Sequence, residues 1–107
     1  MLAIATQSAQ SCANATKDIP IVVTAVTDPK EAGLVQSNEL PGTNVTGTSD
    51  LTPVKEQIEL LTKLLPEAKK VGVLYSSLDT SPMYQAKLAE KEIKNLGLEP
   101  IMATVSQ

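Results

Sequence analysis

The sequence predicts an α/β protein with three layers, in which helices flank a parallel β-sheet. Apolar strand candidates alternate along the chain with segments of helical periodicity, which is the order found in such folds. The strand candidates are continuous runs rich in Val and Ile, as expected when both faces of a sheet are covered. The 107 residues include two Tyr and no Phe or Trp, so the core has to be built from aliphatic side chains.

The first strand and the first helix are expected at the start of the chain. An apolar run over residues 2–6 predicts a strand that ends in small polar residues. A short helix over residues 8–16 follows, and the hydroxyl of Thr6 or Ser8 can cap its first turn. Cys12 lies among alanines on this helix, which is typical of a small core residue.

Two more strands are expected before the middle of the chain. Residues 19–26 are rich in β-branched side chains and form the second strand. This strand stops before Pro29, because a proline pushes the preceding residue, Asp28, toward an extended conformation. A short strand over residues 44–49 comes after a polar segment that is rich in Gly and Pro and too long for a tight connection.

The longest helix is predicted just after this third strand. Thr52 can serve as its N-cap, with Pro53 at the first helical position. A stripe of apolar residues with helical spacing indicates that one face of this helix is buried. The stripe consists of Val54, Ile58, Leu60, Leu61, Leu64, Leu65 and Ala68.

The last third of the chain predicts a strand, a helix and a final strand. The strand covers residues 71–75 and is followed by a polar turn. Ser81 and Pro82 repeat the pattern of cap and proline at the start of the next helix. Gly97 ends that helix in the left-handed conformation, and residues 99–105 supply the last strand.

Charge and residue content argue against several classes of function. The nine basic residues are all lysines, they form no cluster, and the net charge is −3, which disfavours nucleic-acid binding. The sequence has no His and one Cys, so it lacks the usual proton carrier, the commonest metal ligand and an activated thiol. It also lacks the Gly-rich phosphate-binding motifs. We therefore expect no enzymatic activity, no cofactor and no metal.

Five motifs occur in an order that is seen in one known family. They are Ala5–Gln10, Val26–Pro29, Ala32–Val35, Pro41–Gly47 and Lys70–Tyr75. Together they resemble the ABC-transporter substrate-binding proteins of the type I periplasmic-binding-protein class, of the kind that binds tryptophan or tyrosine. The sequence departs from the family's usual pattern at Thr43, where Gly is usual, and at Ser76, where Asn is usual.

The resemblance implies a protein with two flavodoxin-like lobes, of which this chain is an internal, partial piece. It places the end of the first lobe in residues 1–34. A crossover segment between the lobes is expected in residues 35–43, and the start of the second lobe in residues 44–107.

Ligands of open α/β sheets bind beyond the carboxyl ends of the strands, where loops and helix N-termini offer N–H groups. The resemblance implies that such positions face an amino acid, whose carboxylate is held by hydroxyl and N–H groups and whose ammonium pairs with Asp28 or Asp50. From the residues alone, Thr6, Ser8 and Ser81 can equally be helix caps, and Asp28 can be a turn residue. The predicted ligand-binding residues are Thr6, Gln7, Ser8, Thr27, Asp28, Asp50, Ser76, Ser77, Asp79 and Ser81.

The function that the resemblance implies is solute capture for an ABC importer. A small amino acid, expected to be an aromatic one, would be bound between two lobes and passed to a membrane permease. The full protein is expected outside the cytoplasmic membrane, periplasmic or lipid-anchored, although residues 1–6 lack signal-peptide features and no apolar run approaches the ~20 residues of a membrane span.

Taken alone, the piece is expected to bind amino acids weakly or not at all and to self-associate. Exchange of the crossover segment between two copies is the expected route to a domain-swapped homodimer. The alternative interpretation is an independent flavodoxin-like domain, acting as a signalling module or as a small enzyme.

Overall fold

The computed structural model describes residues 1–106, which form two compact units. The first unit comprises Met1–Thr52, and the second begins at Pro53. In each unit a helix packs on a parallel sheet of that unit, so the predicted α/β class is confirmed. The first unit contains β1 (Leu2–Ile4), α1 (Thr6–Ala15), β2 (Ile21–Val26) and β3 (Val45–Ser49). The second contains α2 (Val54–Leu64), β4 (Lys70–Ser76), α3 (Thr80–Asn95) and β5 (Glu99–Val105).

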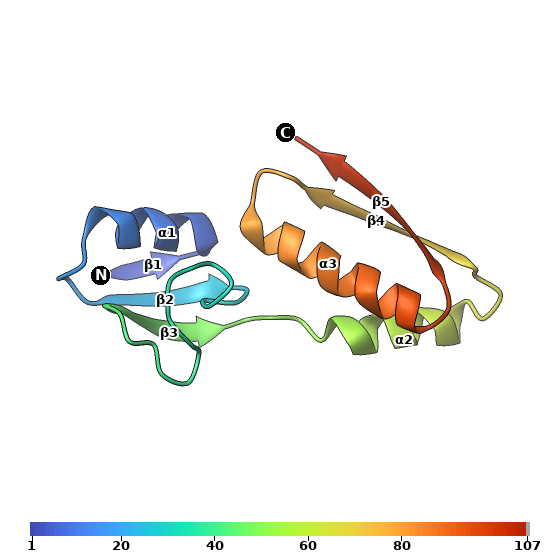
Figure 1. The fold of residues 1–107 in the computed structure, drawn as a ribbon, viewed down its shortest axis with the longest axis horizontal. Helices are drawn as coiled ribbons and strands as arrows, with labels where there is room; N and C mark the ends of the chain where they lie inside the picture. Colours follow the sequence, from blue (N-terminus) through green and yellow to red (C-terminus); the bar gives the residue numbers. More distant parts are fainter. Residues whose placement is uncertain (107) are drawn as a thin grey trace. The chain divides into compact units, whose positions relative to one another are not determined.

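The sheet of the first unit has three parallel strands in the order β1-β2-β3 (Figure 1). Ala3 pairs with Val23, and Ile21 pairs with Val45, so these side chains point to one face of the sheet. α1 packs on this face and completes an aliphatic core. The core consists of Ala3, Ala9, Ala13, Ile21, Val23, Val26, Leu34 and Val45.

The opposite face of this sheet carries exposed apolar side chains. Leu2 and Val22 are paired neighbours and are 66 % and 49 % exposed, and Ile4 is 58 % exposed. The sequence of β2 predicts burial on both faces, but burial alternates along the first half of the strand. The apolar pattern therefore suits a sheet with two covered faces, whereas the described residues cover one of them.

Residues 27–44 form a long connection between β2 and β3 that folds back on the first unit. The Thr43 hydroxyl donates a hydrogen bond to the Leu34 carbonyl at 2.8 Å. The Gln36 N–H donates to the Pro41 carbonyl at 2.8 Å. These bonds close the connection on itself before β3 pairs with β2.

The structure thus corrects the predicted division of the chain. The strand expected in the second lobe pairs with β2 of the first unit, and the boundary between the compact units follows Thr52 instead of lying in residues 35–43. A polar segment of this length can cross between lobes or loop back onto its own sheet, and its composition fits both. Domain swapping through residues 35–43 has no support, because this segment is bonded within its own unit.

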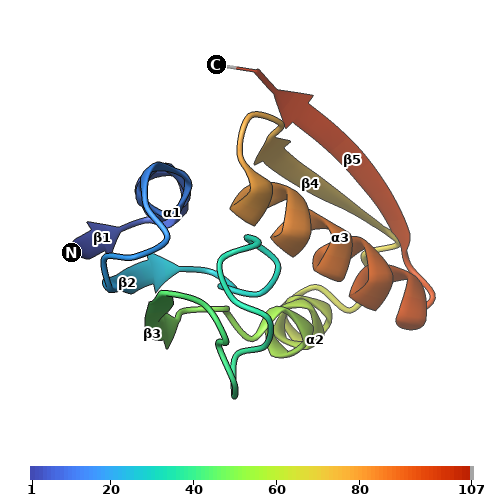
Figure 2. The same ribbon diagram turned by 60° about the vertical axis from the view of Figure 1, so that its left-hand side comes forward.

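The second unit is built on β4 and β5, which pair in parallel from Lys70 opposite Glu99 to Ser76 opposite Val105. α3 packs on this pair, and α2 packs on α3 (Figure 2). Val71, Ala86 and Ile93 are buried where these elements meet. The uncovered face of the sheet displays exposed apolar side chains, among them Leu74, Ile101 and Val105.

The predicted helix starts need correction. The N-cap positions are Ala5 for α1, Pro53 for α2 and Asp79 for α3, and none of these residues makes a side-chain cap hydrogen bond. α1 begins at Thr6 because a left-handed turn at Ala5, with φ of 72°, ends the strand early. Ser81 lies inside α3 rather than at its cap.

Two further expectations concern the helices of the second unit. The longest helix is α3, with 16 residues, whereas α2 has 11. In the apolar stripe of α2, Val54 is buried, but Leu60 and Leu64 are exposed. The end of α3 is as predicted, because Gly97 has a φ of 74° and the Leu98 N–H donates to the Ile93 carbonyl at 3.1 Å.

Candidate ligand-binding site

The predicted site residues fall into two groups, one in each unit. Because β1, β2 and β3 are parallel, their carboxyl ends lie at one edge of the sheet (Figure 1). This first edge brings together Thr6, Gln7, Ser8, Thr27, Asp28 and Asp50. The second edge, after β4, carries Ser76, Ser77, Asp79 and Ser81.

The N-terminus of α1 contributes backbone N–H groups to the first edge. The N-cap residue of this helix, Ala5, makes no side-chain cap bond, and its carbonyl accepts a hydrogen bond from the Ala9 N–H at 3.0 Å. The first turn consists of Thr6, Gln7 and Ser8, and the side chain of Ser8 is exposed. N–H groups and the helix dipole at such a position favour an anion, such as the carboxylate of an amino acid.

The ends of β2 and β3 are tied together at the centre of this edge. The Asp50 N–H donates to the Val26 carbonyl at 3.0 Å, and the Ser49 hydroxyl donates to the Thr27 carbonyl at 2.6 Å. Thr27 is buried, whereas Asp50 is exposed. Sequence reasoning did not single out Ser49, although its position as the last residue of a strand is a signal that could have found it.

Asp28 is held in a hydrogen-bonded turn. Its Oδ1 accepts from the Lys30 N–H at 3.0 Å, from the Glu31 N–H at 3.4 Å and from the Asn38 side-chain amide at 3.1 Å. This is the turn arrangement that the sequence offers as an alternative to ligand contact. The bond to Asn38 also fixes the long connection to the end of β2.

The serines of the second edge make local contacts. The Ser76 hydroxyl accepts from the Leu78 N–H at 3.2 Å. Ser77 donates to the Val105 carbonyl through both its N–H and its hydroxyl, at 3.0 and 3.3 Å. The carboxyl end of β5 therefore belongs to this edge too, and Asp79 follows at the N-cap position of α3.

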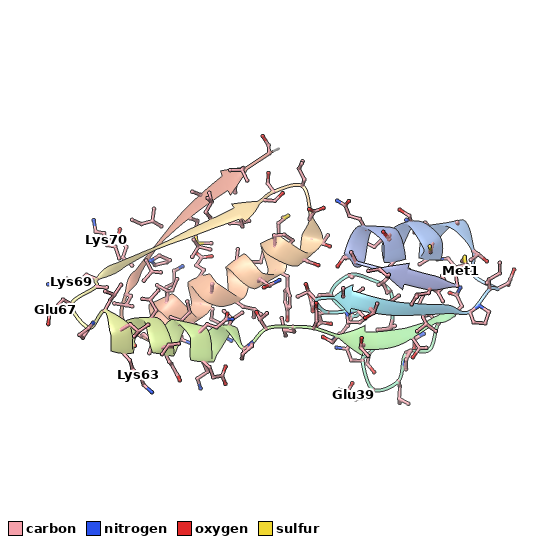
Figure 3. The ribbon with its side chains drawn as sticks, turned by 180° about the vertical axis from the view of Figure 1, so that it is seen from behind. Met1, Glu39, Lys63, Glu67, Lys69 and Lys70 are labelled. Carbon is pink, nitrogen blue, oxygen red and sulfur yellow. The ribbon has the colours of Figure 1, made fainter. Side chains whose placement is uncertain are left out.

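A group of charged side chains of the second unit lies away from this edge. Figure 3 shows Lys63, Glu67, Lys69 and Lys70 near the end of α2 and the start of β4. Lys70 and Glu99 form an ion pair of 3.8 Å at the amino ends of their strands. The second edge is thus composed mainly of hydroxyl groups.

A separate groove of ≈ 320 Å³ lies within the second unit. α2, β4 and α3 line it, and its walls are mostly apolar, with Gln57, Tyr75 and Gln85 among the polar contributors. Of the predicted site residues, none lines this groove. Within residues 1–106, there is no group of three or more His, Cys, Asp or Glu side chains that could hold a metal ion, and no helix is long and apolar enough to cross a membrane.

Comparison with known proteins identifies the family. A family model described as ABC transporter substrate binding protein matches residues 1–107. The chain belongs to this family. Because the match covers the whole sequence, it favours the interpretation as part of a substrate-binding protein over that of an independent flavodoxin-like domain.

Individual relatives of this substrate-binding family member agree with that assignment. A tyrosine-binding protein from Clostridioides difficile (strain R20291) is 47 % identical over 104 residues, which cover 97 % of this chain and 30 % of that protein. A conserved domain protein from Vibrio cholerae gives a TM-score of 0.92 at 43 % identity, over 97 % of this chain and 35 % of the other. An ABC domain from Streptococcus pneumoniae in complex with L-Trp gives 0.92 at 40 % identity, over 97 % and 36 %.

The substrate-binding family member described here therefore spans about a third of the length of these relatives. Its two units correspond to part of a longer architecture.

Proposed function

We propose that the full-length protein captures an amino acid with an aromatic side chain and delivers it to the membrane permease of an ABC importer. The observation that carries this proposal is the similarity of nearly the whole chain to a domain solved with L-Trp and to a tyrosine-binding protein. Capture takes place between two lobes, outside the cytoplasmic membrane, in the periplasm or at a lipid-anchored cell surface. The family's role in this process is to bind a substrate rather than to transform it.

The first edge suits the carboxylate of the ligand. The N-cap residue of α1 is Ala5, which makes no side-chain cap bond, and the partial positive charge of the helix N-terminus lies at this edge. Thr6, Gln7 and Ser8 add side-chain donors to these N–H groups. Hydrogen bonds to a charged carboxylate are stronger than those between neutral groups, which favours this orientation of an amino acid.

The ammonium group is assigned to Asp50 rather than to Asp28. Three donors already bind Oδ1 of Asp28, which holds the turn and the long connection. The Asp50 side chain is exposed, while its backbone is fixed by the bond to Val26. A carboxylate that is exposed on a fixed backbone can form a new ion pair without breaking a turn.

The second edge carries a set of polar groups of its own. Ser76, Ser77, Asp79 and Ser81 lie where a parallel sheet of this type receives its ligand. Ser76 and Ser77 bond to backbone groups and so fix the turn after β4. These residues therefore set the shape of the second edge in addition to contacting the ligand.

Calorimetric titration of the full-length protein is the test. We expect binding of tryptophan or tyrosine, much weaker binding of glycine, and none of glucose. Tight binding of the sugar without binding of any amino acid would refute the proposal.

A further inference from the structure

The groove of the second unit lies at one edge of its sheet. The sheet consists of β4 and β5, and the groove is lined by β4, α2 and α3 but by no described residue of β5. Val54 and Ile58 of α2 form one wall of the groove. Val73 and Leu74 of β4 form another. The groove therefore runs along the edge of β4 that faces away from β5, called here the free edge of β4.

The backbone of β4 offers hydrogen-bonding groups at this free edge. Successive residues of a strand direct their N–H and C=O groups to opposite sides. The Ser77 N–H donates to the Val105 carbonyl at 3.0 Å, so the odd-numbered residues of β4 face β5. Gly72 and Leu74 consequently direct their N–H and C=O groups to the free edge. Among residues 1–106, no strand pairs with β4 on that side.

The outer edge of β5 is less suited to a further strand. The Val105 carbonyl faces β4, so Pro100, five residues earlier, is among the residues of β5 that face away from β4. A proline has no N–H, and within sheets it is confined to edge strands, to strand starts and to bulges. The position of Pro100 thus fits a sheet that ends at β5 and continues beyond β4.

The helix that forms one wall of the groove is incompletely covered. Ile58 and Leu61 belong to the apolar stripe of α2, and both are half-buried. Leu65, at the C-cap position of α2, is 60 % exposed. A helix of an α/β protein buries its apolar stripe on a sheet, whereas α2 packs mainly on α3. A strand along the free edge of β4 would supply the missing surface.

We propose that a strand from the part of the full-length protein outside residues 1–107 pairs with the free edge of β4 and fills the groove beside α2. The chain spans about a third of the length of its relatives, so the full-length protein has sequence enough to supply this strand. The groove walls are mostly apolar, so the side chains that enter the groove are apolar as well. β4 then becomes the central strand of the sheet.

Amide hydrogen exchange of the full-length protein, resolved by residue with NMR, is the test. No ligand is added, so the result is independent of the proposed function. The N–H groups of Gly72 and Leu74 should exchange within about tenfold of the rates of Val73 and Tyr75, which face β5 and serve as internal controls. Faster exchange of Gly72 and Leu74 by more than this factor would overturn the proposal. Protection that rises with protein concentration would indicate a second copy of the protein and would overturn it too.

A proline substitution distinguishes a paired strand from other kinds of cover. Leu74→Pro in the full-length protein removes an N–H at the free edge and leaves the bonds to β5 in place. It should lower the unfolding temperature by about 5 °C or more relative to Leu74→Ala, which removes most of the side chain but keeps the N–H.

The matched control is Thr104→Pro compared with Thr104→Ala. Thr104 is exposed, and its N–H is at the outer edge of β5, so this comparison measures the cost of the proline ring without a lost hydrogen bond. The cost at Thr104 should be the smaller one. Equal costs at the two positions would show that no strand bonds to β4 there.

Discussion

Asp28 and Asp50 both follow strands at the first edge, yet their surroundings give them different roles. Asp28 organises a turn through three hydrogen bonds, one of which comes from Asn38, ten residues further along the chain. The sequence could predict the local part of this turn from the proline that follows Asp28. It could not predict the bond to Asn38, because that contact depends on how the whole connection folds back.

The assignment of the ammonium to Asp50 can be tested by a single change of charge. Asp50→Asn in the full-length protein should weaken binding of the aromatic amino acid by about 2 kcal/mol or more, because the neutral amide cannot pair with the ammonium. Titration calorimetry measures the effect. Asp28→Asn removes the same charge and serves as the control, with a smaller expected loss. A larger loss in the Asp28 variant would assign the ammonium to that residue instead.

Most strands and helices could be predicted at the element scale, whereas their partners could not. The last strand, Glu99–Val105, has the bounds that its composition predicts, and α3 ends where Gly97 predicts. The order of the strands in the sheets could not be predicted, because an apolar pattern identifies a strand but does not indicate which strand it pairs with. This is why β3 was placed in the wrong unit. The helix starts could not be predicted for a similar reason. The backbone turn at Ala5, after which α1 begins, corresponds to no recognisable pattern of side chains in the sequence.

The close approach of β2 and β3 at Gly47 gives a prediction at this scale. Gly47 has a φ of 157°, and a Cβ atom there would lie 2.0 Å from the Val23 carbonyl oxygen. Gly47→Ala should therefore reduce the free energy of unfolding by about 2–4 kcal/mol, because backbone must move to relieve the clash. Urea unfolding of the full-length protein measures this.

Gly72→Ala is the matched control for this substitution, since nothing lies within 4 Å of a Cβ atom built there and its φ is not positive. Its effect should stay within about 0.5 kcal/mol. Equal stability of the two variants would show that β2 and β3 are not packed this closely in solution.

At the scale of the whole molecule, the described residues 1–106 leave one face of each sheet uncovered. Leu2 in the first unit and Leu74 in the second are 66 % and 71 % exposed, and both lie on these faces. Exposed apolar faces of this kind are usually covered in α/β proteins. Since the chain spans about a third of its relatives, the remainder of a full-length protein is the natural source of that cover.

The isolated 107-residue chain should therefore differ from the full-length protein in its association. We expect it to bind a hydrophobic dye and to form oligomers whose mass rises with concentration, because association hides the bare faces. Size exclusion coupled to light scattering, with the full-length protein as the control, measures the mass. A compact monomer at every concentration, without dye binding, would show that the two sheets need no further cover.

The connection between β2 and β3 has a practical consequence that follows from its own hydrogen bonds. Its base is closed by Gln36 and Pro41, while its tip carries Leu40, 78 % exposed, and Glu39, which points away from the sheet in Figure 3. Chain inserted at an exposed tip whose base is fixed disturbs little of the fold. A peptide tag inserted between Glu39 and Leu40 would open the short turn in which Ser37 bonds to Leu40, but it should leave the bond between Gln36 and Pro41 and the pairing of β2 with β3 in place.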